Sequence, residues 1–360
     1  MAAMTPSGRP HSVCYLLAYR EPDYIRTRTI VSALQTVPGL RTLRVINRSR
    51  GWWRYCELLW GLMMIRMRQD PETYILGFRG HEMFWPVRWL TWGRVLIFDA
   101  MMSPYGAIRD EGKLGKWGYL LAGVVKLLER GILKHADQIW TDTRRHRCWM
   151  METFAIPGER IVVVPVGAVE GLSIREQPMK EAPFNVLFYG TFLPLHGVET
   201  IFKAAWLLRD QQVRFTIIGG RPDLAQWIRQ EVKRCEGCVD YRERVPFADL
   251  INCYIPGSDL CLGGPFGDTP QAARVVTGKT QQCLALGKPV VLAHPDPEDG
   301  FRDRYNCLVV PPANPDALAA AIAWARDHPA ELLAISRRGL SLYEHHFSIN
   351  VVRRMIETHV

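Results

Sequence analysis

Short apolar runs alternate with longer amphipathic segments along almost the whole chain of 360 residues. Runs such as SVCYLLAY, RVLIFDA, NVLFYG and KPVVLA have the length and the β-branched and aromatic content of buried strands. Segments 112–135, 197–209, 222–234 and 315–327 have the length of helices. Strands that alternate with helices form parallel sheets with helices on both faces. The sequence therefore predicts an α/β fold.

The expected strands fall into two sets, which a polar stretch separates. That stretch, VEGLSIREQPMKEAP, spans 169–183 and carries two prolines, a composition typical of linkers between domains. We expect a Rossmann-like N-terminal domain over 1–168 and a Rossmann-like C-terminal domain over 184–345. Residues 346–360 are expected to form a helix that can cross back to the first domain. Two doubly wound domains facing each other across a cleft follow, with ligands at the carboxyl ends of the strands.

Positive charge is concentrated in the first half of the chain. Residues 1–180 hold 26 Lys and Arg against 16 Asp and Glu, whereas residues 181–360 hold 19 against 20. This asymmetry predicts an anionic partner for the N-terminal half, either a membrane surface or a polyanion. No recognised nucleic-acid motif accompanies the charge, so nucleic-acid binding is not expected.

Cysteine usage and hydropathy indicate a cytoplasmic protein. The nine cysteines are irregularly spaced, which is typical of reduced thiols rather than a disulfide framework. Cys235 and Cys238 form the one CxxC, and no second pair at a zinc-binding spacing accompanies it. The apolar segments are interrupted by charges before they reach the ~18 residues of a membrane span, and VCYLLA is too short for a signal peptide.

Three glycine-containing loops follow predicted strands in the second half. In NVLFYGTFLPLHGVETIFKAAWLL (185–208), a strand ends at Gly190 and a loop with His196 and Gly197 leads into a helix. A helix N-terminus presents free amides and a positive dipole end, which suit a phosphate. The plainer alternative is an ordinary strand-loop-helix joint. FTIIGG (215–220) and CLGGPFGDTPQAARVVTGKTQQCLALGKPVV (261–291) supply the other two loops.

The combination GTFLPLHGVETIFKAA, TIIGG, LALGKPVV and NCLVVPPANPDALAAAI, in that order, resembles the C-terminal domain of glycosyltransferase family 4. LERGILKHADQIWTDT and ERIVVVPVGA resemble the segment that precedes the linker in these retaining enzymes of the GT-B fold. The resemblance implies a nucleotide diphosphate sugar held by the C-terminal domain and an acceptor held by the N-terminal one. It also implies that neither a metal nor another cofactor is required.

The chain departs from the family pattern at positions that bind the donor. The family's Arg and Lys of the first loop correspond to Thr191 and His196, and the second acid of its Glu-x7-Glu signature corresponds to Gln282. By this resemblance Gln282 would contact the ribose without a charge, and Lys279 would supply the positive charge missing from the first loop. The alternative is an ordinary helix start. Further donor-binding candidates are Gly190, Gly197, Gly219, Arg221, Val245, Gly267, Asp268 and Thr280.

Two places at strand exits offer candidate catalytic groups. Asp99 ends a strand where family members often carry a histidine that faces the donor sugar, and a carboxylate there could accept the acceptor's proton. The alternative role is capping of the segment that follows. His81 and Glu82, in FRGHE, are the other candidates.

A segment rich in Trp and Arg is the candidate membrane- or acceptor-binding element. Its residues are Arg50, Trp52, Trp53, Arg54 and Trp60, at the start of an expected helix over 52–68 that is apolar nearly all round. Such a helix is either buried against the sheet or seated in a membrane interface. The choice stays open at this point.

These features predict a glycosyltransferase that acts at the inner face of the plasma membrane on a glycan or lipid-linked acceptor. Polysaccharide or cell-envelope synthesis would be its setting. The alternative is a catalytically silent GT-B subunit that supports a partner transferase, because the family's acids and its Arg-Lys pair are absent.

Overall fold

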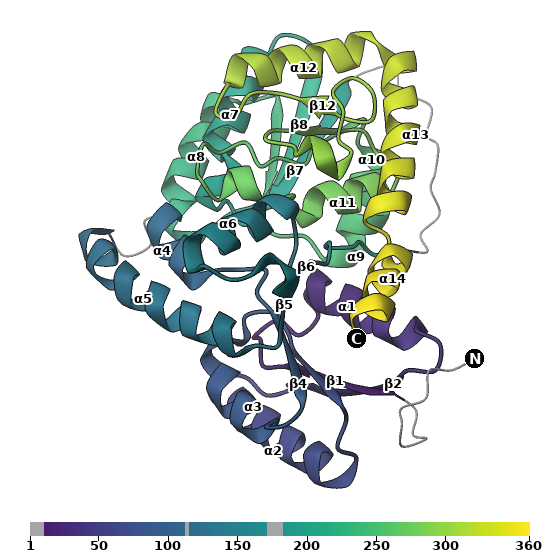
Figure 1. Cartoon of the computed structure of the whole chain (residues 1–360). Coiled ribbons are helices and arrows are strands. Elements are labelled where there is room, and N and C mark those ends of the chain that lie inside the picture. Colours follow the sequence, from purple (N-terminus) through teal and green to yellow (C-terminus); the bar gives the residue numbers. More distant parts are fainter. Residues whose placement is uncertain (1–10, 112–114, 171–182) are drawn as a thin grey trace. The chain divides into compact units, whose positions relative to one another are not determined.

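The computed structural model describes residues 11–111, 115–170 and 183–360, and most of the predicted linker, 171–182, lies outside them. The chain divides into two compact units. The N-terminal unit contains Met1–Gly167 together with Ile349–Val360, and the C-terminal unit contains Ala168–Ser348. Each unit is built around one parallel six-stranded sheet (Figure 1).

The sheet of the N-terminal unit has the strand order β2-β1-β3-β4-β5-β6. After β2 the chain returns to the other side of β1, so the winding direction reverses between β1 and β3. In open parallel sheets this reversal point is where ligands bind. The strands are β1 (Ser12–Leu17), β2 (Arg41–Ile46), β3 (Thr73–Leu76), β4 (Val95–Asp99), β5 (Gln138–Thr141) and β6 (Ile161–Val163).

Helices cover both faces of this sheet because the strands are apolar on both sides. In β1, Cys14 and Leu16 face the helices α2, α3, α5 and α6, whereas Val13, Tyr15 and Leu17 face α1 and α14. The C-terminal helix α14 packs beside α1 (Figure 1). The helices are α1 (Ile25–Thr36), α2 (Trp53–Arg68), α3 (Phe84–Leu90), α4 (Pro104–Glu111), α5 (Gly115–His135), α6 (Arg144–Phe154) and α14 (Ile349–His359).

The sheet of the C-terminal unit has the strand order β12-β11-β10-β7-β8-β9. Its winding direction reverses between β7 and β10, which is therefore its expected ligand-binding point. The strands are β7 (Phe184–Gly190), β8 (Val213–Gly219), β9 (Val239–Arg242), β10 (Leu260–Leu262), β11 (Val290–Leu292) and β12 (Leu308–Val309).

The helices of this unit also lie on both faces. Residues of α7, α8 and α12 pack on one face of β7 and β8, and residues of α11 and α13 pack on the other (Figure 1). The helices are α7 (Val198–Leu207), α8 (Ala225–Arg234), α9 (Phe247–Asp249), α10 (Ile255–Gly257), α11 (Gly278–Ala285), α12 (Pro315–Asp327) and α13 (Pro329–His346).

The predicted α/β class and doubly wound sheets are confirmed. A strand stands at each place where the sequence predicts one, within a few residues at the ends. The structure adds β9, whose sequence VDYR is short, half-buried and charged at two of four positions. That composition gives none of the apolar signal on which strand prediction depends.

Candidate active site

Glycines bring the ends of β7 and β8 into contact at the carboxyl edge of the second sheet. A Cβ on Gly219 would lie 1.8 Å from the carbonyl oxygen of Gly190, which no side chain could occupy. The φ angle of Gly219 is also positive, at 117°. The glycine after β8 is therefore required by close backbone approach as well as by its conformation.

The loop after β7 packs against the loop after β10, across the reversal point of the sheet. Gly197 adopts the left-handed conformation, and a Cβ there would lie 2.4 Å from the carbonyl carbon of Phe266. The amide of Gly267 donates a hydrogen bond to the carbonyl of Leu195 at 3.0 Å. These contacts place the N-terminus of α7 next to the loop that follows β10.

His196 and Lys279 both lie close to Gly190 at this point. A Cβ on Gly190 would lie 3.2 Å from Nδ1 of His196 and 3.5 Å from Nζ of Lys279. His196 belongs to the loop before α7, and Lys279 belongs to the first turn of α11. Both side chains therefore reach the end of β7. Sequence analysis named both as donor-binding candidates, and the structure brings them together.

Burial lowers the pKa values of both Lys279 and His196. It lowers the pKa of Lys279 from its usual 10.5 to about 7, and it lowers the pKa of His196 well below its usual value, with the Lys279 charge adding to the effect. Nζ of Lys279 lies 5.5 Å from the ring centroid of Phe188. Within the described parts of the chain it makes neither a hydrogen bond nor an ion pair. The site thus holds a desolvated amine ready to pair with an anion.

Two threonines, Thr277 and Thr280, connect the start of α11 to the loop after β10. Oγ1 of Thr277 donates to the carbonyl of Gly263 at 2.7 Å and lies 3.3 Å from Oγ1 of Thr280. Thr280 is fully buried, so its hydroxyl supports the loop and has no exposed surface to offer a ligand. Thr191, in contrast, is exposed beside Gly190.

Gln282 is occupied by the backbone of Val169. Its Oε1 accepts a hydrogen bond from the amide of Val169 at 2.9 Å, and its Nε2 donates to the same residue's carbonyl at 3.4 Å. The ribose contact implied for Gln282 would have to compete with this pairing. The neighbouring Gln281 is also buried, and its Oε1 has no hydrogen-bond partner among the described residues.

The remaining donor-side candidates have mixed surroundings. Arg221 forms an ion pair with Asp223, with Nε at 3.0 Å from Oδ1. Val245 is half-buried and packs on the core beneath α11, and Asp268 is exposed at the end of the loop after β10.

A pocket of about 560 Å³ lies in the N-terminal unit. Its walls come from the segments that follow β1, β3 and β4 and from the first turn of α2, so it opens at the reversal point of the first sheet. His81 and Glu82 line it, as does Arg54. The other lining residues are Ala18, Tyr19, Arg20, Arg79, Met102, Pro104 and Ala107.

Next to His81 lies a carboxyl group that was not among the candidates predicted from the sequence. Oε1 of Glu129, on α5, is 3.8 Å from Nε2 of His81, and neither atom has a hydrogen-bond partner in the described parts of the chain. Burial raises the pKa of Glu129 to about 7 and lowers the pKa of His81 to about 3. Glu129 also accepts hydrogen bonds from the hydroxyl of Ser103 and the amide of Tyr105.

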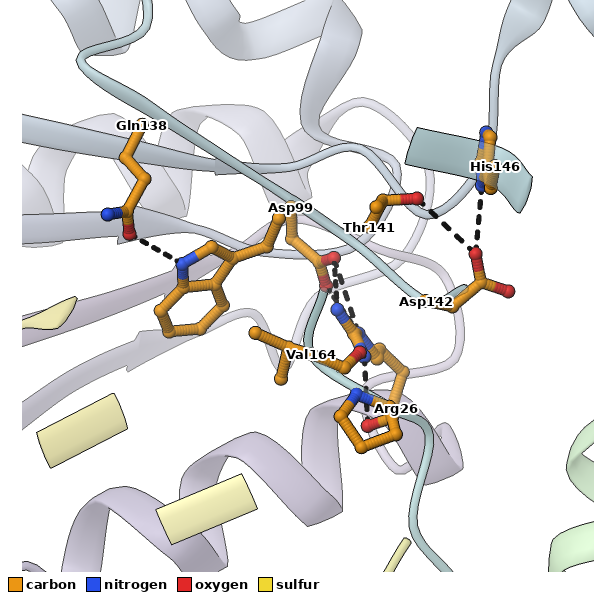
Figure 2. Close-up of polar contacts among 9 residues, drawn as sticks. Arg26, Asp99, Gln138, Thr141, Asp142, His146 and Val164 are labelled. Carbon is orange, nitrogen blue, oxygen red and sulfur yellow. Dashed lines mark hydrogen bonds and ion pairs between the residues drawn. The ribbon is translucent and has the colours of Figure 1, made fainter. Parts of the chain in front are cut away.

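Asp99, the first catalytic candidate, lies elsewhere. Its side chain is fully buried and forms a two-point ion pair with the fully buried Arg26, with Nη2 at 2.9 Å from Oδ1 (Figure 2). The Arg26 guanidinium also donates to the carbonyls of Val164 and Pro165. Asp99 therefore ties β4 to α1 and has no exposed surface with which to meet an acceptor. The alternative expectation, a helix cap, is not what the carboxylate does either.

A family model for glycosyl transferases group 1 matches residues 183–327. The match lies within the C-terminal unit, and it confirms the predicted resemblance to glycosyltransferase family 4 and the predicted type of enzyme. No curated protein matches the chain significantly.

Solved structures of other glycosyltransferases share the fold of both units. A glycosyltransferase of Rickettsia africae superposes with a TM-score of 0.67 at 12% identity, covering 97% of each chain. Sucrose-phosphate synthase of Thermosynechococcus elongatus gives 0.69 at 13% identity, covering 97% of this chain and 98% of that one. HepE of Anabaena, solved in complex with UDP-glucose, gives 0.69 at 12% identity, covering 96% and 98%. The predicted GT-B fold is thus confirmed.

The candidate membrane element of this glycosyltransferase is half-buried. The inner face of α2 buries Leu58 and Leu62 against the sheet, whereas its outer face exposes apolar side chains. Helix α3 packs against α2, and α5 packs against α3. Both helices also expose apolar side chains on their outer faces. We call this surface the tryptophan face; its exposed residues are Trp52, Trp53, Trp60, Met67, Trp85, Trp89, Trp92, Leu121, Val124, Leu127 and Leu128.

Sequence analysis found only the α2 part of the tryptophan face. Trp89 and Trp92 are 77% and 74% exposed, more than Trp52, Trp53 and Trp60, which are 60–64% exposed. No described helix of this glycosyltransferase combines the length and the apolar character needed to cross a bilayer. The described residues also contain no group of three His, Cys, Asp or Glu side chains able to hold a metal ion.

Proposed function

We propose that the enzyme transfers a sugar from a nucleotide diphosphate sugar to a glycan or lipid-linked acceptor, with retention and without a metal. The observation that carries the proposal is the placement of Lys279 and His196 together at Gly190, the end of β7. Both lie at the reversal point of the second sheet, beside the N-termini of α7 and α11. The donor complexes of the Anabaena structure are consistent with a nucleotide sugar as the ligand of this fold.

In the proposed reaction the leaving diphosphate is neutralised by the chain's own groups. Lys279 supplies a cation at the end of β7, and the amides at the start of α7 and α11 add partial positive charge. Because Lys279 is desolvated, its attraction for a diphosphate is stronger than that of a surface lysine. The neutral His196 can donate one hydrogen bond through Nε2 when Nδ1 accepts from the amide of Leu193, as the 3.3 Å distance indicates.

His81 replaces Asp99 as the proposed proton acceptor for the acceptor hydroxyl. It lines the pocket, whereas Asp99 is sealed in its pair with Arg26. Glu129 is the proposed positioning residue, because an ionised carboxylate 3.8 Å from Nε2 would stabilise an imidazolium. The acceptor oxygen would then attack the anomeric carbon on the face from which the diphosphate departs.

The tryptophan face supports a peripheral membrane location at the inner face of the plasma membrane. Trp side chains favour the interface between headgroups and acyl chains, and Arg side chains beside them favour anionic lipids. Arg50 and Arg68, at the two ends of α2, are exposed. Apolar patches on soluble monomers seldom involve so many large side chains from adjacent helices unless they bind something.

A donor screen tests the proposed reaction. Wild-type protein should show a thermal shift with a uridine, guanosine or adenosine diphosphate sugar, and Lys279→Met should lose it. Lys233→Met, which removes an exposed charge from α8 in the same unit, is the control and should keep the shift. Absence of any shift with all three classes in wild-type protein would refute the proposal.

Vesicle binding tests the membrane location separately. Wild-type protein should sediment with vesicles that contain anionic lipid, and a Trp52→Ala, Trp53→Ala double variant should sediment less. Trp206→Ala, which removes an exposed tryptophan from the C-terminal unit, should behave as wild type. Equal and negligible sedimentation of all three proteins would contradict the membrane role.

A further inference from the structure

The pocket of the N-terminal unit is lined by more positive than negative charge. Arg20, Arg54 and Arg79 line it, and Glu82 is its one acidic lining residue. His81 adds no charge near neutral pH, because burial lowers its pKa to about 3. The pocket therefore carries a net positive charge when empty.

Arg79 has an unusual backbone conformation and an unpaired charge among the described residues. Its backbone is left-handed, with φ of 59° and ψ of 31°, although the residue is not glycine. Such a conformation is uncommon for a long side chain and is usually found where the surrounding structure imposes it. Its guanidinium carbon lies 5.8 Å from the ring centroid of Tyr19, and among the described residues it makes no hydrogen bond or ion pair.

Arg54 also has unused hydrogen-bonding capacity. Its Nε is buried and lacks a partner in the described parts of the chain. One terminal nitrogen donates to the hydroxyl of Tyr55 at 2.5 Å and lies 3.8 Å from Oε2 of Glu82. The Tyr55 hydroxyl donates to the same Glu82 oxygen, so that carboxylate is shared between two donors and does not fully neutralise Arg54.

Arg20 completes the set from the end of β1. Its one recorded ion pair is with Glu21 at 3.5 Å, and both side chains are more than 60% exposed. An exposed pair of this kind is weak and is easily exchanged for another anion. Three arginines from three segments therefore converge on one pocket with their charge largely uncompensated.

The N–H groups of arginine side chains have the geometry and charge to bind oxyanions. A guanidinium binds phosphate or carboxylate through two parallel N–H groups, and this recognition is stronger than a neutral hydrogen bond. The volume of about 560 Å³ is typical of small-molecule sites and leaves room for more than the anionic group alone. Met102, Pro104 and Ala107 supply an apolar wall for the rest of the ligand.

We propose that this pocket binds an anionic group of the acceptor, a phosphate-type oxyanion, through Arg79 and Arg54. As an acceptor assignment it rests on the proposed glycosyl transfer, and it adds the chemical class of the second substrate. The anion can belong to a phospholipid headgroup or to a soluble phosphorylated acceptor. Because Arg54 belongs to the first turn of α2, next to Trp53 of the tryptophan face, both sources are compatible with its position.

Binding of sn-glycerol 1-phosphate to the full-length protein, measured by calorimetry, tests the soluble source. Arg79→Gln should weaken binding by about tenfold or more, since a charged hydrogen-bonded contact is lost. Arg79→Lys should recover part of the affinity, which also shows that the loss does not come from misfolding. Arg354→Gln is the matched control, because it removes one exposed charge from α14, which packs on the opposite face of the sheet from α2.

Vesicles of phosphatidylcholine with and without phosphatidic acid test the lipid source. Loss of phosphatidic acid dependence in Arg79→Gln, but not in Arg354→Gln, would assign the pocket to a headgroup. The proposal is overturned if the binding of glycerol phosphate and the binding of phosphatidic acid vesicles are both independent of Arg79. It is also overturned if glycerol binds as tightly as glycerol phosphate.

The donor site needs its own control, because it too is built for phosphate. Binding of glycerol phosphate that disappears in Lys279→Met and persists in Arg79→Gln belongs to the donor site and overturns the proposal. Donor binding to Arg79→Gln should equal that of wild type. A protein that binds glycerol phosphate through Arg79 but no nucleotide sugar would disprove the proposed function and leave the anion site standing.

Discussion

The side-chain amide of Gln282 pairs with both backbone polar groups of Val169. It accepts from the amide at 2.9 Å and donates to the carbonyl at 3.4 Å, which fixes the start of the C-terminal unit onto α11. Nearby, the hydroxyl of Tyr343 accepts from the amide of Ala168 and donates to Glu170. A carboxylate at 282 could accept but could not donate, so the two-point contact explains why an amide stands there.

Gln282→Glu should therefore destabilise the protein. We expect a loss of about 1–3 kcal/mol in the free energy of unfolding at neutral pH, because the carbonyl of Val169 loses its donor and faces a carboxylate. Urea unfolding of Gln282→Glu and of Gln230→Glu, an exposed position on α8, measures it. A more stable Gln282→Glu variant with tighter donor binding would instead show that position 282 serves the ribose.

Donor binding should take up a proton above pH 7. Burial lowers the pKa of Lys279 to about 7, so a growing fraction of the amine is neutral as pH rises, and a bound diphosphate favours the charged form. Affinity for a nucleoside diphosphate should fall as pH rises from 7 to 9. Calorimetry in buffers of different ionisation enthalpy should report proton uptake at pH 8 for wild type. Uptake of the same size in Lys279→Met would contradict this assignment.

Asp99→Asn should lower stability first and activity only through it. A buried ion pair that loses one partner leaves an uncompensated charge on Arg26, at a cost of about 3–5 kcal/mol. Asp23→Asn, which alters an 87% exposed carboxylate of the same unit, should change stability little. A stable Asp99→Asn variant with turnover abolished would restore Asp99 as a catalytic residue.

The raised pKa of Glu129 should make the free energy of unfolding depend on pH. Its pKa is about 7 when folded, against 4.5 ordinarily, so the unfolded chain releases this proton first and stability falls as pH rises from about 4.5 to 7. Over that pH range the free energy of unfolding of Glu129→Gln should rise relative to that of wild type, by up to about 3 kcal/mol. Unfolding free energies at pH 5 and pH 8 measure the difference. A variant that instead loses ground at pH 8 would mean that Glu129 is ionised and paired with His81.

The sequence was a good guide where periodicity and length carry the signal. Strands such as β1 and β7 are continuous apolar runs because both faces of a parallel sheet are buried. For α2 the sequence left burial and membrane contact as alternatives, and the structure buries Leu58 but exposes Trp60. Trp89 and Glu129 were missed because their neighbours come from other helices, and sequence spacing does not reveal such contacts.

The candidate site was predicted in its loops more than in its side chains. Gly197 and Gly219 come at or after strand ends in the sequence, and close backbone approach at the sheet edge requires them. Gly190 ends its strand beside the side chains of His196 and Lys279. Asp99 was selected because it ends a strand, yet its pairing with Arg26, from a helix early in the chain, is a tertiary contact. Lys279 and His196 are 83 positions apart in the sequence, and only the sheet topology brings them to one point.

Turnover of the donor is the most direct test of the central claim, that Lys279 holds the leaving diphosphate in a working glycosyltransferase. The measurement is the release of nucleoside diphosphate from the donor that gives the largest thermal shift, with phosphorylated and neutral acceptors. Wild-type protein and Lys233→Met should release it at similar rates, and Lys279→Met should be slower by about a hundredfold or more. Release by Lys279→Met at the wild-type rate, or none by wild type with any donor, would contradict the account.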